Sequence, residues 1–164
     1  MSMAEPIPPD LEELCLEAPE LLLRAPRESD LDAMARIDAE WSGVDRREYL
    51  RARLGRALRP DGVTLARVAA LGDRVLGFLV GEVTRGEYGR VEPVAWIDTV
   101  GVGRDAARKG VGRALLDDFL RHARAAGATR VRTLLDPEQE ALAEFLDAQG
   151  FRMAPTRVVE RALR

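Results

Sequence analysis

The sequence predicts an α/β protein with a mixed central β-sheet of six to seven strands and helices on both faces of the sheet. Three observations predict it. Candidate strands and helices follow in the order β-α-α-β-β-β-α-β-α-β, one strand is apolar on both faces, and a long amphipathic helix follows that strand. The chain has 164 residues, 46% of them hydrophobic and 32% charged, as is typical of one globular domain. We divide it into an N-terminal extension, residues 1–19, and one domain, residues 20–164.

The first part of the domain is expected to contain one strand and two helices. Leu21–Ala25 is a short apolar run that predicts the strand. Ser29 and Asp45 each precede an apolar pattern of helical spacing. Each is followed three positions later by an acidic residue, Asp32 and Glu48, and this pattern is typical of a helix start.

The middle of the chain predicts three consecutive strands. Val63–Leu71 and Arg74–Val83 are rich in β-forming residues and are separated only by Gly72-Asp73, which indicates a tight hairpin. Val94–Val102 follows and is apolar on both faces apart from Asp98. Such a strand belongs in the middle of a sheet that is covered on both sides.

The last third predicts alternating helices and strands. Gly110–Ala126 is strongly amphipathic, with an apolar residue at every fourth position. Its crossover to a strand at Arg130–Leu135 should be parallel and right-handed. Asp136 should cap a second helix that ends at Gly150. Arg157–Leu163 is expected to form a final strand.

The loop between the central strand and the long helix carries the strongest chemical signal. Glycines let backbone N–H groups converge there, the helix dipole adds partial positive charge, and basic side chains add full charges. An anion site suited to a diphosphate is therefore one interpretation, and a simple glycine turn is the other. The spacing fits neither a Walker A loop nor a Rossmann fingerprint. The residues concerned are Arg108, Lys109, Gly110, Gly112 and Arg113.

Two segments resemble the motifs of a known family. Ile97–Val102 together with Arg108–Leu116 resembles motif A of the GNAT acetyltransferase superfamily, whose pattern is Gln/Arg-x-x-Gly-x-Gly/Ala. Ala141–Phe151 resembles the family's motif B, which ends in Gly-Phe. The predicted strand order also agrees, so the resemblance extends over residues 20–164. It implies an acetyl-CoA-dependent N-acetyltransferase that acts on a primary amine of a small molecule or protein.

The resemblance also implies where acetyl-CoA (coenzyme A) binds. It places a bulge of the fourth strand at Val102, whose backbone N–H would polarise the thioester carbonyl, and it leaves Val100 and Val102 free to pair with the pantetheine amides. No metal ion is expected. The expected cofactor-binding residues are Val100, Gly101, Val102, Arg108, Lys109, Gly110, Val111, Gly112, Arg113 and Ala114.

Departures from the family pattern affect the catalytic apparatus. Ala107 occupies the Gln/Arg position of motif A, and Leu146 occupies the place of a Tyr that serves many members as general acid. An Asn that often contacts coenzyme A is also not evident in Asp136–Glu140. A catalytically weak acyl-CoA-binding regulatory GNAT domain is therefore a second hypothesis. An unrelated phosphate-binding α/β domain is a third.

Asp98 is the candidate general base. By the two-residue period of a strand it should share a face with Trp96, Val100 and Val102. A carboxylate on such a face is costly to bury without a partner or water, so a structural ion pair with an arginine is the alternative. Glu82 is a second candidate base or another arginine partner.

Other residues with possible roles each have a simpler interpretation. Tyr88 either replaces the missing acid or is a surface tyrosine, and Trp41 lines an acceptor pocket or the core. His122 is expected at the surface. The lone Cys15 cannot form an internal disulfide.

Charge and hydropathy limit the partners. The net charge is −3, with 28 acidic and 25 basic residues, which argues against a general nucleic-acid binder. Apolar runs fall short of the roughly 18 residues that span a bilayer, so we expect no membrane contact and a cytoplasmic location. The resemblance further implies a homodimer.

Overall fold

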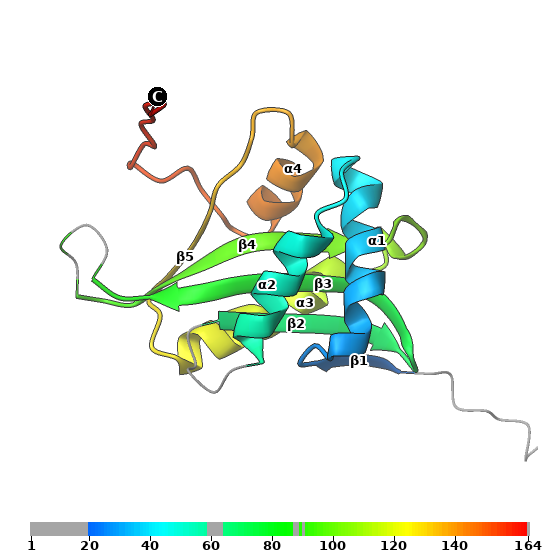
Figure 1. The fold of residues 1–164 in the computed structure, drawn as a ribbon. Helices are drawn as coiled ribbons and strands as arrows, with labels where there is room; N and C mark the ends of the chain where they lie inside the picture. Colours follow the sequence, from blue (N-terminus) through cyan, green and yellow to red (C-terminus); the bar gives the residue numbers. More distant parts are fainter. Residues whose placement is uncertain (1–19, 59–63, 87–88, 90, 164) are drawn as a thin grey trace, which may run out of the picture. The chain divides into compact units, whose positions relative to one another are not determined.

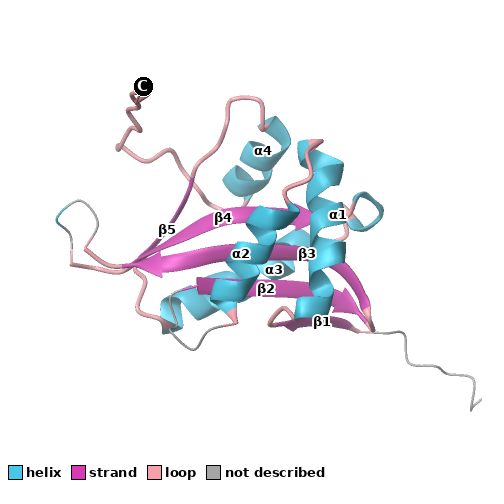
Figure 2. Ribbon diagram, viewed as in Figure 1, coloured by secondary structure: helices cyan, strands magenta, loops and turns pink. Residues whose placement is uncertain are grey.

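The computed structural model describes residues 20–58, 64–86, 89 and 91–163. Within these residues five strands form one sheet in the order β1-β2-β3-β4-β5, accompanied by four α-helices and two short 3₁₀ turns (Figures 1 and 2). The strands are β1 Leu21–Arg24, β2 Thr64–Leu71, β3 Arg74–Thr84, β4 Val94–Val102 and β5 Arg130–Thr133. The helices and turns are η2 Glu28–Asp30, α1 Leu31–Ser42, α2 Arg47–Ala57, η4 Arg104–Ala106, α3 Val111–Ala125 and α4 Glu140–Ala148.

The chain forms two units, residues 1–132 and 133–164. The first contains β1 to β4, most of β5, and helices α1 to α3. The second contains α4 and the C-terminal segment. Within it, the guanidinium of Arg152, which follows α4, lies 2.9 Å from the carboxylate of Asp147 in α4.

The sheet confirms the predicted mixed architecture. Strands β1 to β4 pair antiparallel in sequence order, and Leu71 lies opposite Arg74 across the two-residue turn that Gly72-Asp73 predicted. Strand β5 lies beside β4. The backbone N–H of Thr129 donates to the carbonyl of Pro93 at 3.1 Å, so both strands start at the same end of the sheet and run in the same direction.

Helices cover both faces of the sheet in the first unit, as predicted. Helices α1 and α2 pack on one face and α3 on the other (Figure 1). The predicted apolar line of α3 is fully buried, and Phe119 from this line lies against Gly81 of β3, where a Cβ atom would meet its ring at 2.8 Å. The α1/α2 face contains a second buried cluster, which includes Met34, Ile37, Leu50, Val68, Phe78 and Val80.

Several sequence-based boundaries were wrong. The described part of the sheet has five strands rather than six or seven, because residues 157–163 form no strand and their side chains are exposed. Helix α1 begins after η2, where Asp30 rather than Asp32 accepts a backbone N–H, that of Arg27 at 2.7 Å. Asp45 does accept the N–H of Arg47 at the start of α2.

Helix α4 also begins later than predicted. Residues 136–139 form a turn, in which the Gln139 side chain accepts the N–H of Asp136 at 3.0 Å and the Gln139 N–H returns to the Asp136 carbonyl. This contact closes a turn that precedes Glu140, the first helical residue, so Asp136 does not cap the helix itself.

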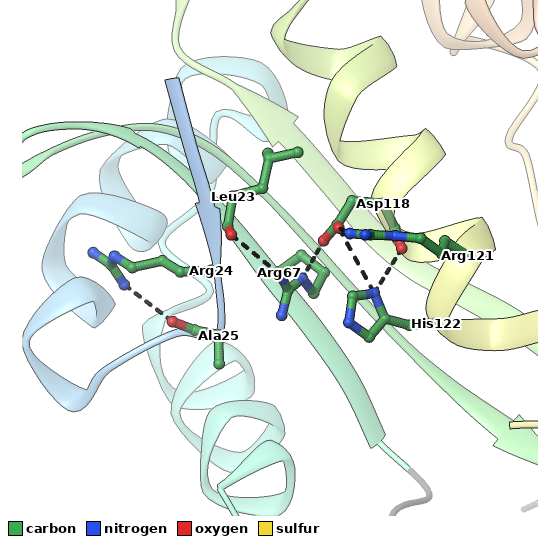
Figure 3. Close-up of polar contacts among 7 residues, drawn as sticks. All are labelled: Leu23, Arg24, Ala25, Arg67, Asp118, Arg121 and His122. Atoms are coloured by element: carbon green, nitrogen blue, oxygen red, sulfur yellow. Dashed lines mark hydrogen bonds and ion pairs between the residues drawn. The ribbon is translucent and has the colours of Figure 1, made fainter. Parts of the chain in front are cut away.

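A buried carboxylate links α3 to the sheet. Asp118 of α3 has a side chain that is only 1% exposed, and it forms ion pairs with Arg67 of β2 and Arg121 of its own helix (Figure 3). Arg67 also donates to the carbonyl of Leu23 in β1 at 3.3 Å, and His122 Nδ1 lies 2.8 Å from the Asp118 carbonyl. One carboxylate thus connects three elements. His122, expected at the surface, is half-buried beside it.

Replacing Asp118 with Asn is expected to destabilise the fold. Burial raises the pKa of Asp118, but hydrogen bonds from Arg121 and Arg67 outweigh it and leave the pKa below its ordinary value. The substitution leaves Arg67, which is 15% exposed, without its counter-charge. Breaking a buried pair in this way typically costs about 3–5 kcal/mol. Denaturant unfolding at neutral pH measures the loss.

The contribution of Asp118 to the free energy of unfolding should depend on pH. Since the folded pKa is depressed, the stabilisation is present above the unfolded pKa of about 4 and is lost as pH falls through the folded value. The wild-type and Asp118→Asn proteins should therefore converge in acid. Asp117→Asn, at an exposed neighbouring site, is the control and should change stability by less than about 0.5 kcal/mol. Equal losses in the two variants at neutral pH would contradict this role for Asp118.

Candidate functional site

The loop from β4 to α3 has an unusual backbone. The N–H of Gly103 donates to the Leu76 carbonyl at 2.8 Å and closes the ladder between β3 and β4, after which η4 turns the chain toward α3. Gly110, directly before the helix, has a φ of 82°, and Arg108 has a φ of 60°. A side chain other than glycine costs about 1–2 kcal/mol in the left-handed region, and such strain gathers at functional sites.

This backbone leaves a series of donors unused. Among the described residues, no protein acceptor takes a hydrogen bond from the N–H groups of residues 108–113, and the first helical donor is Ala114, whose N–H reaches the Gly110 carbonyl at 3.0 Å. Successive free N–H groups at a helix N-terminus form a concave anion site. The structure therefore favours the anion-site interpretation over a simple turn.

Three basic side chains belong to the same segment as these donors. Arg108, Lys109 and Arg113 are all exposed. Lys109 Nζ donates to the Asp105 carbonyl at 2.9 Å, which anchors its ammonium at the loop, and Arg113 has only a distant ion pair with Asp117 at 3.8 Å. The charge of the cations is thus largely available to a bound anion with more than one negative charge.

The end of α1 holds the start of this loop. Trp41 Nε1 donates to the Val102 carbonyl at 2.6 Å, and the guanidinium of Arg104 lies 4.9 Å from the centre of the Trp41 ring. Glu40 accepts the N–H of Arg104 at 2.8 Å through its carboxylate, and its own carbonyl accepts Arg104 Nη2 at 2.7 Å. We call Glu40, Trp41, Val102 and Arg104 the clasp. Sequence reasoning missed Glu40 and Arg104.

The outer edge of β4 is open near its C-terminal end. Because Gly103 bonds to Leu76, the alternation of an antiparallel ladder makes the Gly77/Val102 and Leu79/Val100 pairs non-hydrogen-bonded. The N–H and C=O groups of Val100 and Val102 therefore point away from β3. The described neighbour on that side, β5, has four residues against nine in β4, and it starts level with the beginning of β4. The N–H groups of Val100 and Val102 are therefore oriented as pairing with a further strand would require.

The bulge of β4 lies at Asp98, not at Val102 as the resemblance implied. Val80 pairs with Thr99 and Gly81 with Ile97, so Asp98 has no opposite residue on β3. An extra residue shifts the side-chain alternation by one position. Asp98 consequently points toward α2, where it pairs with Arg53, whereas Val102 lies on the α3 face beside Gly77. The expectation that Asp98 shares a face with Val100 and Val102 was wrong for this reason.

Asp98 lies in a polar cluster beneath α2. Arg53 Nη2 is 3.0 Å from Asp98 Oδ2, and Arg53 Nη1 is 3.3 Å from Glu82 Oε2. The Asp98 contact is an ion pair without hydrogen-bond alignment, since Oδ2 is buried and accepts no hydrogen bond from the described residues. The Tyr49 ring lies between the guanidinium groups of Arg46 and Arg53, at 5.6 and 5.7 Å. The structure thus provides the arginine partner that the sequence left as an alternative.

Burial and charge act in opposite directions on Asp98. Burial raises the pKa of its carboxyl above the ordinary value, Arg53 lowers it, Glu82 raises it and Arg56 lowers it, with a net rise. A carboxylate whose pKa is raised is a stronger base than a free one, which suits proton transfer.

The remaining predicted residues are either paired, buried or outside the described part of the chain. Glu82 is paired with Arg53, and Leu146 is buried in α4 and offers no proton. Tyr88 and Cys15 lie outside the described residues. Arg53 was missed, although its place between Leu50 and Leu54 of the apolar stripe was a signal that it lies at the inner face of α2.

Comparisons with known proteins identify the family of the chain. A profile of the acetyltransferase (GNAT) family matches residues 21–151. A search of curated sequences finds no significant match. Among the described residues, none of the helices is long and apolar enough to cross a bilayer.

Several solved structures share the fold. A transcriptional regulator from Bacillus halodurans C-125 has a TM-score of 0.74 at 20% identity, covering 88% of this chain and all of that one (100%). The aminoglycoside N-acetyltransferase AAC(6')-Iy in complex with CoA has a TM-score of 0.76 at 16% identity, covering 91% and 99%. An aminoglycoside acetyltransferase from an uncultured soil metagenomic sample, in complex with sisomicin, has a TM-score of 0.65 at 20% identity, covering 88% and 95%.

Replacing Gly112 with Asp is expected to abolish binding of inorganic pyrophosphate. A carboxylate in the first turn of α3 is favourable to the helix dipole, by about 0.3–1 kcal/mol, so the fold should be retained. The same carboxylate repels a diphosphate from the free N–H groups. Isothermal titration with pyrophosphate measures the loss.

Gly55→Asp is the matched control for this experiment. It adds the same charge at an exposed position of α2, where a Cβ meets no atom within 4 Å. It should leave pyrophosphate affinity unchanged. A folded Gly112→Asp protein that binds as well as the control would refute the anion site.

Proposed function

Because the chain belongs to the GNAT acetyltransferase family, we propose that it transfers the acetyl group of acetyl-CoA to a primary amine of a small molecule or protein. The observation that carries the proposal is the row of free N–H groups at residues 108–113, at the N-terminus of α3 and surrounded by exposed cations. This donor set fits the diphosphate of coenzyme A. The bound cofactor would supply the activated thioester acyl group.

Residues of β4 would bind the rest of the cofactor. The open edge at Val100 and Val102 offers backbone groups to the pantetheine amides, in the manner of an added strand. The carbonyl of Val102 is already used by Trp41, so its N–H is the free group. That N–H would stabilise negative charge on the acyl oxygen, and Gly101 allows the close packing of Phe78 and Ile37 behind the strand.

The acceptor amine must lose a proton, and we assign this step to Asp98. Its carboxylate projects from the bulge toward α2, with a pKa raised mainly by burial. It would take the proton directly or through water. Leu146 cannot return a proton to the thiolate, so the thiolate would leave unprotonated or be protonated by water.

The catalytically weak regulatory domain is the second candidate. It is favoured by the ion pair that engages Asp98 and by the apolar Leu146, and a fold relative is described as a transcriptional regulator. The unrelated phosphate-binding domain is excluded by the family match. We also propose that the protein is a cytoplasmic homodimer, which sedimentation at micromolar concentration would test.

Binding and turnover together distinguish the two candidates. We expect thermal stabilisation by coenzyme A that exceeds stabilisation by ATP or NAD at equal concentration. Of the three ligands, only coenzyme A has a pantetheine arm that would pair with the β4 edge. We also expect acetyl transfer to at least one member of an amine panel, after the rate of acetyl-CoA hydrolysis without amine is subtracted. The panel should include aminoglycosides, since similar structures contain sisomicin and a neamine bisubstrate analogue. Coenzyme A binding without turnover on any amine would favour the regulatory domain.

Asp98→Asn is expected to lower the rate by about 10²–10⁴-fold, the usual contribution of general base catalysis. The amide keeps the shape and loses the basicity, so coenzyme A affinity should change little. The acidic limb of the pH–rate profile should flatten. Leu146→Phe is the control, because it changes the other departure from the family pattern and should leave that limb in place.

A folded Asp98→Asn enzyme with wild-type turnover would return Asp98 to a structural role. Glu82 or a water chain would then be the proton acceptor. Steady-state kinetics over a range of pH, with coenzyme A binding measured in parallel, separates these outcomes.

A further inference from the structure

One guanidinium is shared by two carboxylates from neighbouring strands. Arg53 reaches Asp98 of β4 with one terminal nitrogen at 3.0 Å and Glu82 of β3 with the other at 3.3 Å. The side chains of Arg53, Asp98 and Glu82 are 18%, 16% and 27% exposed. The pairing is thus largely shielded from solvent, where ion pairs are screened less than at the surface.

Arg53 is itself fixed in place. Tyr49 lies one helical turn earlier on α2, and its ring centre is 5.7 Å from the Arg53 guanidinium carbon. Leu50 and Leu54, on either side of it in the sequence of α2, are buried in the core. The guanidinium therefore has a defined position relative to the bulge of β4.

The charges of the three side chains indicate that Arg53 does more than stabilise the fold. Two carboxylates and one guanidinium leave the trio with one uncompensated negative charge. The Asp98 contact lacks hydrogen-bond alignment, so Arg53 acts on Asp98 chiefly through its charge. An ion pair of this kind favours the ionised carboxylate without occupying it by a directed hydrogen bond.

We propose that Arg53 is a positioning residue whose charge keeps the Asp98 carboxylate ionised, and that Glu82 opposes it. The proposal rests on the proposed function, in which Asp98 receives the proton of the amine. Arg53 needs to contact neither the amine nor the cofactor. Its effect reaches the reaction only through the charge state of Asp98.

The surrounding groups set the direction of each change. Burial raises the pKa of Asp98, Arg53 and Arg56 of α2 lower it, and Glu82 raises it. Further groups on this side of the sheet already have partners: Arg46 pairs with Asp38 of α1 and approaches Thr99 at 3.4 Å, and Arg132 of β5 lies over the Trp96 ring at 5.8 Å. Removing Arg53 should therefore raise the pKa of Asp98, and removing the charge of Glu82 should lower it.

The test is a set of pH–rate profiles of the full chain with acetyl-CoA and its best amine. Arg53→Met should move the acidic limb to higher pH, because Asp98 then ionises less readily. Glu82→Gln should move it to lower pH. Arg53→Lys keeps the charge and should restore most of the wild-type position. Arg51→Met, at an exposed position of α2 that pairs only with Glu48, should leave the limb where it is.

A measurement on the protein alone removes the dependence on turnover. Carbon-13 carboxylate NMR, with the Asp98 signal assigned from its loss in Asp98→Asn, gives the titration of Asp98 directly. The order of titration midpoints should be Glu82→Gln lowest, wild type and Arg53→Lys between, and Arg53→Met highest. If Arg53→Met fails to fold, Arg53→Lys and Glu82→Gln still test the order.

The outcomes distinguish this inference from the proposed function. If Asp98→Asn removes the acidic limb while Arg53→Met and Glu82→Gln leave it and the NMR midpoint unmoved, Arg53 is only structural and the inference falls. If the NMR midpoints move as expected but the limb persists in Asp98→Asn, Asp98 is not the base, and the proposed function loses that step. Movement of both in the expected directions supports both.

Discussion

The bulge of β4 is the constraint on which the site depends. A strand without it would place Asp98 on the same face as Val100 and Val102. With Asp98 unpaired on β3, the strand changes face within one residue. Asp98 lies under α2 with Arg53, while Val102 lies on the α3 side and the backbone edge of β4 opens outward. Asp98 and Val102 thus share one strand and lie on opposite faces of it.

Around this strand, packing and polar contacts fix the positions of the helices. Glycines in β3 and β4 allow Phe119 of α3 and Ile37 of α1 to approach the sheet from opposite faces. A Cβ atom at Gly81 would lie 2.8 Å from the Phe119 ring, and one at Gly101 would lie 3.1 Å from the Ile37 side chain. The clasp then joins α1 to the end of β4, through the Trp41 indole and the Glu40 carboxylate. The C-terminal end of α1 is therefore held by direct side-chain contacts against the start of the loop between β4 and α3.

Sequence patterns predicted those features that depend on local periodicity. The apolar line of α3, the hairpin at Gly72-Asp73 and the glycine-rich start of α3 all follow from spacing along the chain, and all are present. The bulge could not be predicted from the sequence, because it is defined by the pairing of β4 with β3. The residues next to Asp98 in the chain do not specify that pairing. Arg53 and the clasp join elements far apart in the chain, so no local pattern announces them. The prediction of a final strand was wrong. Val158 and Val159 have high strand propensity, but a strand also needs a neighbouring strand and packing, and the side chains of Val158, Val159 and Leu163 are exposed.

The loop between β4 and α3 also contains Lys109, the single lysine of the chain; the other basic positions counted as Lys or Arg are all arginine. Lysine loses its proton far more readily than arginine, whose guanidinium remains charged throughout the usable pH range. Reagents selective for aliphatic amines therefore have one side-chain target in this protein, the exposed Lys109. A fluorophore attached there would report on the occupancy of the loop with no engineered residue. A diphosphate seated on the neighbouring N–H groups would shield the same ammonium from labelling, so the rate of modification is itself a gauge of ligand binding.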